Sequence, residues 1–101
     1  MNFVNHPANR AAELVNAGYT ILDVRERSEL STGTLPDSTN IPLGELITRI
    51  KSYPTSTKFA VICQSGGRST QAAATLFSLG YLDVVNLHGG VNGAIARSRV
   101  A

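Results

Sequence analysis

The sequence predicts an α/β domain in which helices cover both faces of a parallel sheet. In the second half of the chain, short apolar runs alternate with segments of helical spacing, which is typical of right-handed βαβ crossovers. One of these runs, 59–62, is continuously apolar, as expected of a strand buried on both faces. The chain has 101 residues and no internal repeat or shift in composition, so we expect one domain over 1–101.

The first half of the chain is expected to hold one helix, one buried strand and a long loop. Residues 6–18 have helical spacing, with a proline near the start and Gly18 as the stop. Residues 19–24 are rich in β-formers and short enough for a buried strand. The stretch 25–42 begins with helix-compatible charged residues and then becomes loop-like, with a brief strand at 39–41.

The second half carries the clearest alternation of elements. Apolar residues at helical spacing predict a helix over 43–50, followed by the strand 59–62. A second helix is expected from near Arg68 to Gly80, followed by a strand over 83–87. The pair Gly89-Gly90 then opens a last short helical segment.

Composition and charge limit the classes of function. Hydrophobic residues make up 43% and charged residues 16% of the chain, which is typical of a soluble globular protein. The net charge is +2 without a basic cluster, so we expect no nucleic-acid or membrane partner. No apolar run reaches membrane-span length, and the N-terminus does not resemble a signal peptide. The single cysteine cannot form an internal disulfide, so a reducing, cytoplasmic location is expected.

That cysteine, Cys63, occupies the most informative position in the chain. It follows the buried strand directly and precedes a glycine-containing turn and a helix. In parallel sheets the reactive crevice lies at the carboxyl ends of the strands. Backbone N–H groups and the positive end of a helix dipole favour the thiolate, which is the nucleophilic form. The alternative is a buried, inert cysteine; the turn, the arginine and the helix together favour a reactive thiol.

The residues after the cysteine have the composition of an anion-binding loop. Two adjacent glycines let backbone N–H groups converge on one point, and an arginine adds a charge-assisted contact. The two serine hydroxyls either donate to the same anion or cap the following helix. The candidate site is therefore Cys63 as nucleophile, with Gln64, Ser65, Gly66, Gly67, Arg68 and Ser69 as the residues that bind substrate.

Four motifs in order resemble the rhodanese family of single-domain sulfurtransferases: ILDVRE at 21–26, GTLPDSTNIPL at 33–43, VICQSGGRSTQAA at 61–73 and GYLDVVNLHGGV at 80–91. The resemblance implies a three-layer α/β/α sandwich around a five-stranded parallel sheet. It also implies that Cys63 accepts sulfur as a persulfide. Backbone amides from Gln64 to Arg68 would cradle that sulfur, and Arg68 would help to bind the anionic donor.

Two positions depart from the family pattern. Thr34 follows Gly33 where the family commonly has histidine. The family also commonly has a tryptophan shortly after Gly-Gly-Val, whereas the stretch 92–94 of this chain is Asn-Gly-Ala. Neither position supplies the nucleophile, but small residues at the second one are expected to loosen the packing of the C-terminal helix.

Loop length distinguishes two chemistries. Four residues, 64–67, separate Cys63 from Arg68, one fewer than in tyrosine phosphatases. The shorter loop suits a persulfide sulfur and should crowd a tetrahedral phosphate or arsenate. The sequence therefore predicts sulfur transfer in preference to phosphatase or arsenate-reductase activity.

The expected activity is that of a thiosulfate sulfurtransferase with cyanide or a thiol as acceptor. Thioredoxin or another sulfur-accepting protein is a further candidate acceptor, and a persulfide-carrier or docking role is the alternative. We expect no metal or organic cofactor, because His6 and His88 are isolated in sequence. Asp23 and Arg25 are expected to anchor neighbouring loops through hydrogen bonds or an ion pair, and His88 to stabilise its loop.

Overall fold

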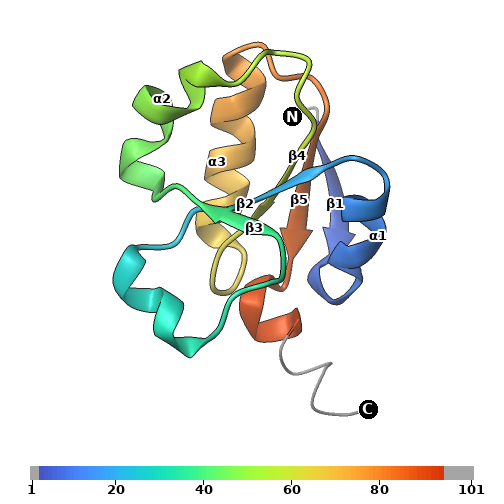
Figure 1. The fold of residues 1–101 in the computed structure, drawn as a ribbon, viewed down its shortest axis with the longest axis vertical. Coiled ribbons are helices and arrows are strands. Elements are labelled where there is room, and N and C mark those ends of the chain that lie inside the picture. Colours follow the sequence, from blue (N-terminus) through green and yellow to red (C-terminus); the bar gives the residue numbers. More distant parts are fainter. Residues whose placement is uncertain (1–2, 95–101) are drawn as a thin grey trace.

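The computed structural model describes residues 3–94, which form a five-stranded sheet with helices on both sides (Figure 1). All strands are parallel, and their order is β1-β5-β4-β2-β3. This confirms the predicted α/β class and the number of strands that the family resemblance implies. The strands are β1 (Val4–Pro7), β2 (Thr20–Asp23), β3 (Ser38–Asn40), β4 (Phe59–Ile62) and β5 (Val84–His88).

Three helices and four 3-10 turns connect the strands. The helices are α1 (Ala11–Asn16), α2 (Leu46–Arg49) and α3 (Gly67–Ser78). The 3-10 turns are η1 (Ala8–Arg10), η2 (Arg27–Thr32), η3 (Leu43–Glu45) and η4 (Ile50–Ser52). Residues 90–94 are also helical, as the glycine pair predicted. None of the helices in the described part of the chain is long and apolar enough to cross a membrane.

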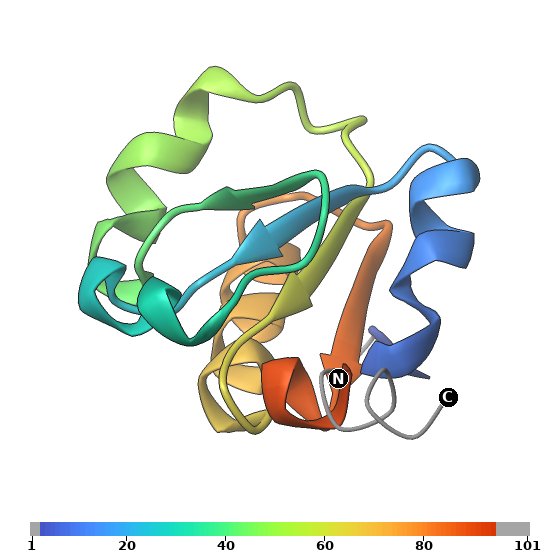
Figure 2. The same ribbon diagram turned by 60° about the horizontal axis from the view of Figure 1, so that its bottom comes forward.

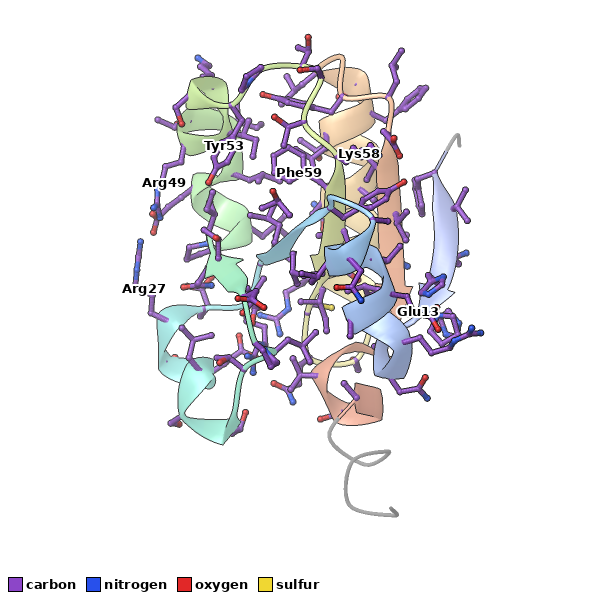
Figure 3. The ribbon with its side chains drawn as sticks, turned by 45° about the vertical axis from the view of Figure 1, so that its right-hand side comes forward. Glu13, Arg27, Arg49, Tyr53, Lys58 and Phe59 are labelled. Carbon is purple, nitrogen blue, oxygen red and sulfur yellow. The ribbon has the colours of Figure 1, made fainter. Side chains whose placement is uncertain are left out.

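Two apolar clusters, one on each face of the sheet, make the domain a three-layer structure. Alternation along β4 divides its side chains between them. Phe59 and Val61 pack with α2 and α3, whereas Ala60 and Ile62 pack with α1 and the helical residues 90–94. All four residues of β4 are fully buried, which confirms the prediction of a strand covered on both faces. Tyr53 and Phe59, labelled in Figure 3, meet edge to face with ring centroids 5.4 Å apart.

The prediction of a helix over 6–18 was wrong at its start. Residues 4–7 form β1, which pairs with β5 from Val4 opposite Val85 to Pro7 opposite His88. Pro7 has an extended backbone and ends the strand, so that the helical turns begin only at Ala8. Because β1 lies at the edge of the sheet, proline is tolerated there.

The predicted helix over 43–50 is also interrupted. Its α-helical part is limited to α2, and 3-10 turns precede and follow it. Its apolar spacing nevertheless predicted the buried face correctly, since Leu46 and Ile50 are each 1% exposed. In the stretch expected to become a loop, residues 27–32 form the 3-10 turn η2, in which no residue is buried.

Candidate active site

Cys63 lies immediately beyond the carboxyl end of β4, at the start of the loop that leads into α3. Figure 2 shows this loop beside the helical turn that follows β5. Two hydrogen bonds join the two segments: Val91 N–H donates to the Cys63 carbonyl at 2.9 Å, and Asn92 N–H to the Gln64 carbonyl at 3.0 Å. The loop is therefore fixed along its backbone, and Cys63 itself is only 1% exposed.

Opposing effects set the acidity of the Cys63 thiol. Burial raises its pKa, because the charged thiolate loses solvation. Hydrogen bonds from the Ser69 hydroxyl and from the backbone N–H groups of Ser69, Gly66 and Ser65 lower it, and together they outweigh burial. The Gly66 N–H donates to the sulfur at 3.1 Å. The pKa of Cys63 consequently lies below the ordinary value for cysteine, which favours the nucleophilic thiolate.

Donors from the first turn of α3 surround the Gly66 carbonyl. The Thr70 hydroxyl and N–H donate to it at 2.9 Å and 3.2 Å, and the Ser69 hydroxyl, whose single hydrogen can point either to this carbonyl or to the Cys63 sulfur, lies 3.0 Å away. Gly66 has a φ of 122°, a conformation that side chains rarely adopt. Ser69 is fully buried, whereas Ser65 and Gly67 are exposed at the outer edge of the loop.

Gly90 supports the loop from the neighbouring segment, a role that sequence reasoning missed. A Cβ atom at this position would lie 2.5 Å from the carbonyl oxygens of both Cys63 and Gln64. Gly90 also has a φ of 61°. Only glycine allows this close approach of two backbones. The available signal is the Gly-Gly pair, which the sequence places in the family motif at 80–91 and at the start of a helical segment, without indicating a contact with the Cys63 loop.

Arg68 forms an ion pair with Glu29 beside the loop. Its Nη1 and Nη2 donate to the two carboxylate oxygens of Glu29, in η2, at 2.5 Å and 2.7 Å. This pairing, with a smaller contribution from the Glu26 N–H, lowers the pKa of Glu29 to about 2. The pKa of Arg68 is raised, chiefly by Glu29 and to a lesser extent by the nearby Cys63. Sequence reasoning placed Arg68 in the site but missed Glu29.

A buried ion pair anchors the surrounding loops, as predicted. Arg25 is fully buried and its Nη2 donates to Asp23 at 2.8 Å and to the Gly33 carbonyl at 2.8 Å. Its Nη1 donates to Gln64 Oε1 at 3.1 Å, and Gln64 Nε2 donates to Asn92 Oδ1 at 2.6 Å. The Gln64 side chain therefore joins three segments of backbone. Because these contacts occupy the Gln64 side chain, we expect Gln64 to contact substrate through its backbone amide.

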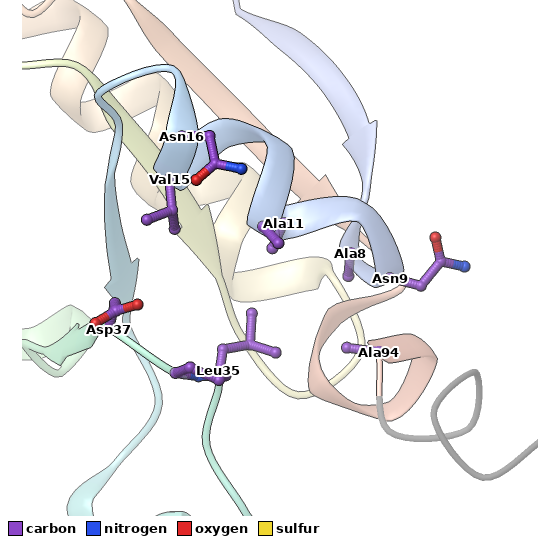
Figure 4. Close-up of a pocket in the computed structure, with 10 residues that line it drawn as sticks. Ala8, Asn9, Ala11, Val15, Asn16, Leu35, Asp37 and Ala94 are labelled. Atoms are coloured by element: carbon purple, nitrogen blue, oxygen red, sulfur yellow. The ribbon is translucent and has the colours of Figure 1, made fainter. Parts of the chain in front are cut away.

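A pocket of about 320 Å³ lies away from the Cys63 loop (Figure 4). Residues from η1 and α1, residues 35–37 and Ala94 line it. Ala94, in the stretch where the rhodanese family commonly has tryptophan, is one of the residues that line this pocket. Ala94 and Val91 are nevertheless buried in the adjacent apolar cluster.

No group of three or more His, Cys, Asp or Glu side chains within residues 3–94 has the arrangement of a metal site. His6 Nε2 lies 3.3 Å from a carboxylate oxygen of Glu13, on the α1 side of the sheet. His88 is exposed at the end of β5.

The fold and the site define a class: an α/β domain with an activated cysteine in a loop at the carboxyl edge of its sheet. The sequence model described as the rhodanese-like domain matches residues 7–96, and the chain belongs to this family.

Named relatives and a solved structure agree with this assignment. A protein named sulfurtransferase from Allochromatium vinosum is 35% identical over 71 residues, which are 70% of this chain and 66% of the relative, just under two thirds of its length. The thiosulfate:glutathione sulfurtransferase of Homo sapiens is 31% identical over 75% of this chain and 78% of that protein. The crystal structure of a rhodanese-related protein from Thermoplasma volcanium superposes with a TM-score of 0.81 at 38% identity, covering 96% of this chain and 93% of that one.

Proposed function

We propose that the protein is a sulfurtransferase that carries a sulfane sulfur as a persulfide on Cys63. The observation that carries the proposal is the hydrogen bond from the Gly66 N–H to the Cys63 sulfur at 3.1 Å, which together with the other donors of the loop lowers the pKa of this buried thiol. The names of the relatives support the same reaction class. Thiosulfate is the proposed donor, and cyanide or a thiol, including that of thioredoxin or another partner protein, is the proposed acceptor.

The reaction proceeds by two displacements at sulfur. The Cys63 thiolate attacks the outer sulfur of thiosulfate, the sulfur–sulfur bond of the donor breaks, and sulfite leaves with the electron pair. The acceptor then attacks the terminal sulfur of the persulfide, and the Cys63 thiolate leaves. Atoms and electrons balance without a further oxidant or reductant, and the covalent intermediate implies ping-pong kinetics.

The loop contributes electrostatic stabilisation in both steps. The N–H groups that lower the pKa of the thiol also favour the terminal sulfur of an ionised persulfide, because both species are anionic. The loop leads directly into the amino end of α3, a helix of 12 residues whose dipole adds positive potential at the same point.

The alternatives make different predictions. A phosphatase or an arsenate reductase would have to accommodate a tetrahedral oxyanion in a loop with only four residues between Cys63 and Arg68. A docking module would not need a thiol whose pKa the loop lowers. A persulfide carrier would use the same loop but would depend on a partner protein for sulfur.

Steady-state turnover with thiosulfate and cyanide tests the proposal. We expect thiocyanate to form with parallel lines in double-reciprocal plots, and the Cys63→Ser variant to be inactive. Turnover that requires an added partner protein would favour the carrier. Hydrolysis of a phosphate ester by the wild type, without thiocyanate formation, would overturn the proposal.

A further inference from the structure

The cation nearest the proposed donor site is already paired. Arg68 donates through both of its terminal nitrogens to Glu29, at 2.5 Å and 2.7 Å, and the two side chains are 36% and 28% exposed. A fork-to-fork pair of this kind is the strongest geometry for a guanidinium and a carboxylate. An anion that approaches Cys63 therefore meets the field of a carboxylate together with that of the arginine.

Several contacts hold Glu29 in this position. Glu29 accepts the Glu26 N–H at 2.9 Å, and together they form a capping box at the start of η2. The buried Arg25 donates from Nη1 to the Glu29 carbonyl at 3.2 Å. Because η2 has no buried residue, these polar contacts fix its place beside the loop.

The charges near the proposed sulfur-transfer centre do not favour a doubly charged donor. The Cys63 thiolate and Glu29 each carry one negative charge, and Arg68 carries one positive charge, so the three groups sum to one negative charge. Without Glu29 the thiolate and Arg68 would balance, and the charge of Glu26, which also acts on Arg68, would remain, so removing Glu29 takes one negative charge from the site.

We infer that Glu29 is a specificity-determining residue that lowers the affinity of the Cys63 loop for dianions. This inference rests on the proposed function of the loop. Glu29 offsets the charge of Arg68, so that backbone N–H groups and the α3 dipole bind the donor. The site thereby binds thiosulfate less tightly than an unpaired Arg68 would allow, and Glu29 lowers the affinity for a dianion more than it lowers the affinity for a donor with a single negative charge.

Methanethiosulfonate is the matched singly charged donor, because it also transfers a terminal sulfur, with methanesulfinate as the leaving group. The Glu29→Gln variant removes the charge but keeps an oxygen acceptor for the Glu26 N–H. Since Coulomb energy scales with ligand charge, we expect KM to fall about five-fold for thiosulfate and about two-fold for methanethiosulfonate. The difference should shrink at high salt, since both groups are partly exposed.

Glu45→Gln is the control. Glu45 pairs with Arg27 and Arg49, whose side chains Figure 3 shows on the same side of the molecule. The substitution changes the net charge equally but leaves the Arg68 pair intact, so KM for both donors should match the wild type. A higher thiosulfate KM or a lower kcat in Glu29→Gln would overturn the inference and assign Glu29 to the alignment of Arg68. Equal changes for both donors would also overturn it.

A measurement without turnover separates this inference from the proposed function. Sulfate, an inert dianion, can compete with iodoacetamide from the entrance of the loop without fitting inside it, and it should protect Cys63 from alkylation at lower concentration in Glu29→Gln than in the wild type. For each protein, the alkylation rate with sulfate is divided by the rate without sulfate, so that differences in thiol reactivity between the two proteins cancel. If the wild type never forms a persulfide but sulfate protection tightens in the variant, the proposed function fails and the charge inference stands. Identical protection in the two proteins would contradict the inference.

Discussion

Replacing Gly90 by alanine should displace the Cys63 loop and lower the free energy of unfolding. The added Cβ would lie 2.5 Å from the carbonyl oxygens of Cys63 and Gln64 and 2.6 Å from the Gln64 carbonyl carbon. All three are backbone atoms, and hydrogen bonds from Val91 and Asn92 hold the two carbonyls in place. No flexible side chain can move aside to relieve the contact.

The expected loss of stability has two parts. The left-handed backbone conformation costs an alanine about 1 to 2 kcal/mol. Moving the loop away weakens two backbone hydrogen bonds, at about 1 kcal/mol each. The sum is about 3 to 4 kcal/mol, a large fraction of the 5–15 kcal/mol by which domains are typically stable.

Urea unfolding followed by circular dichroism measures this loss, and the pH dependence of Cys63 alkylation reports the loop geometry. Gly93→Ala is the matched control, because Gly93 lies in the same helical segment and a Cβ there would meet nothing within 4 Å. The control should be at least as stable as the wild type, since alanine favours helix over glycine. A Gly90→Ala protein with wild-type stability and wild-type thiol acidity would contradict the predicted displacement of the Cys63 loop.

Three further predictions concern the charges around the site. Ser69→Ala removes a hydroxyl that lowers the pKa of Cys63, so the alkylation midpoint should move to higher pH; an unchanged midpoint would contradict this role. Arg25→Met leaves the buried Asp23 carboxylate without its partner and should cost about 3 to 5 kcal/mol in urea unfolding; wild-type stability would contradict the anchoring role. Because folding lowers the pKa of Glu29 from 4.5 to about 2, ionised Glu29 stabilises the folded protein at pH values above 4.5. This stabilisation is lost as the pH falls towards about 2. Thermal melts should therefore lose more stability over that range in the wild type than in Glu29→Gln, and parallel curves would contradict this linkage.

The elements that sequence reasoning located correctly are those with local signals. The strand 59–62 is continuously apolar, and the helix after the Cys63 loop has regular apolar spacing up to a terminal glycine. β1 has no such signal. Its central residues, Asn5 and His6, are polar, and it is a strand only because β5, far along the chain, supplies its hydrogen-bonding partners. Proline then made the same segment resemble the start of a helix.

The candidate site divides in the same way. Cys63 and its loop are contiguous in sequence, so strand, glycine turn and helix could be read together. Glu29 and Gly90 come from distant segments that only the folded sheet brings to the loop. The capping box that Glu29 forms with Glu26 is seen only in the structure, and no local sequence pattern indicates that its carboxylate reaches Arg68.

The intact mass of the protein after incubation with thiosulfate shows whether Cys63 carries a sulfur atom. We expect the wild-type protein to gain the mass of one sulfur atom, cyanide to remove it, and Cys63→Ser to gain nothing. A wild-type protein that gains no sulfur, or a Cys63→Ser variant that gains it equally, would contradict the assignment of Cys63 as the sulfur carrier.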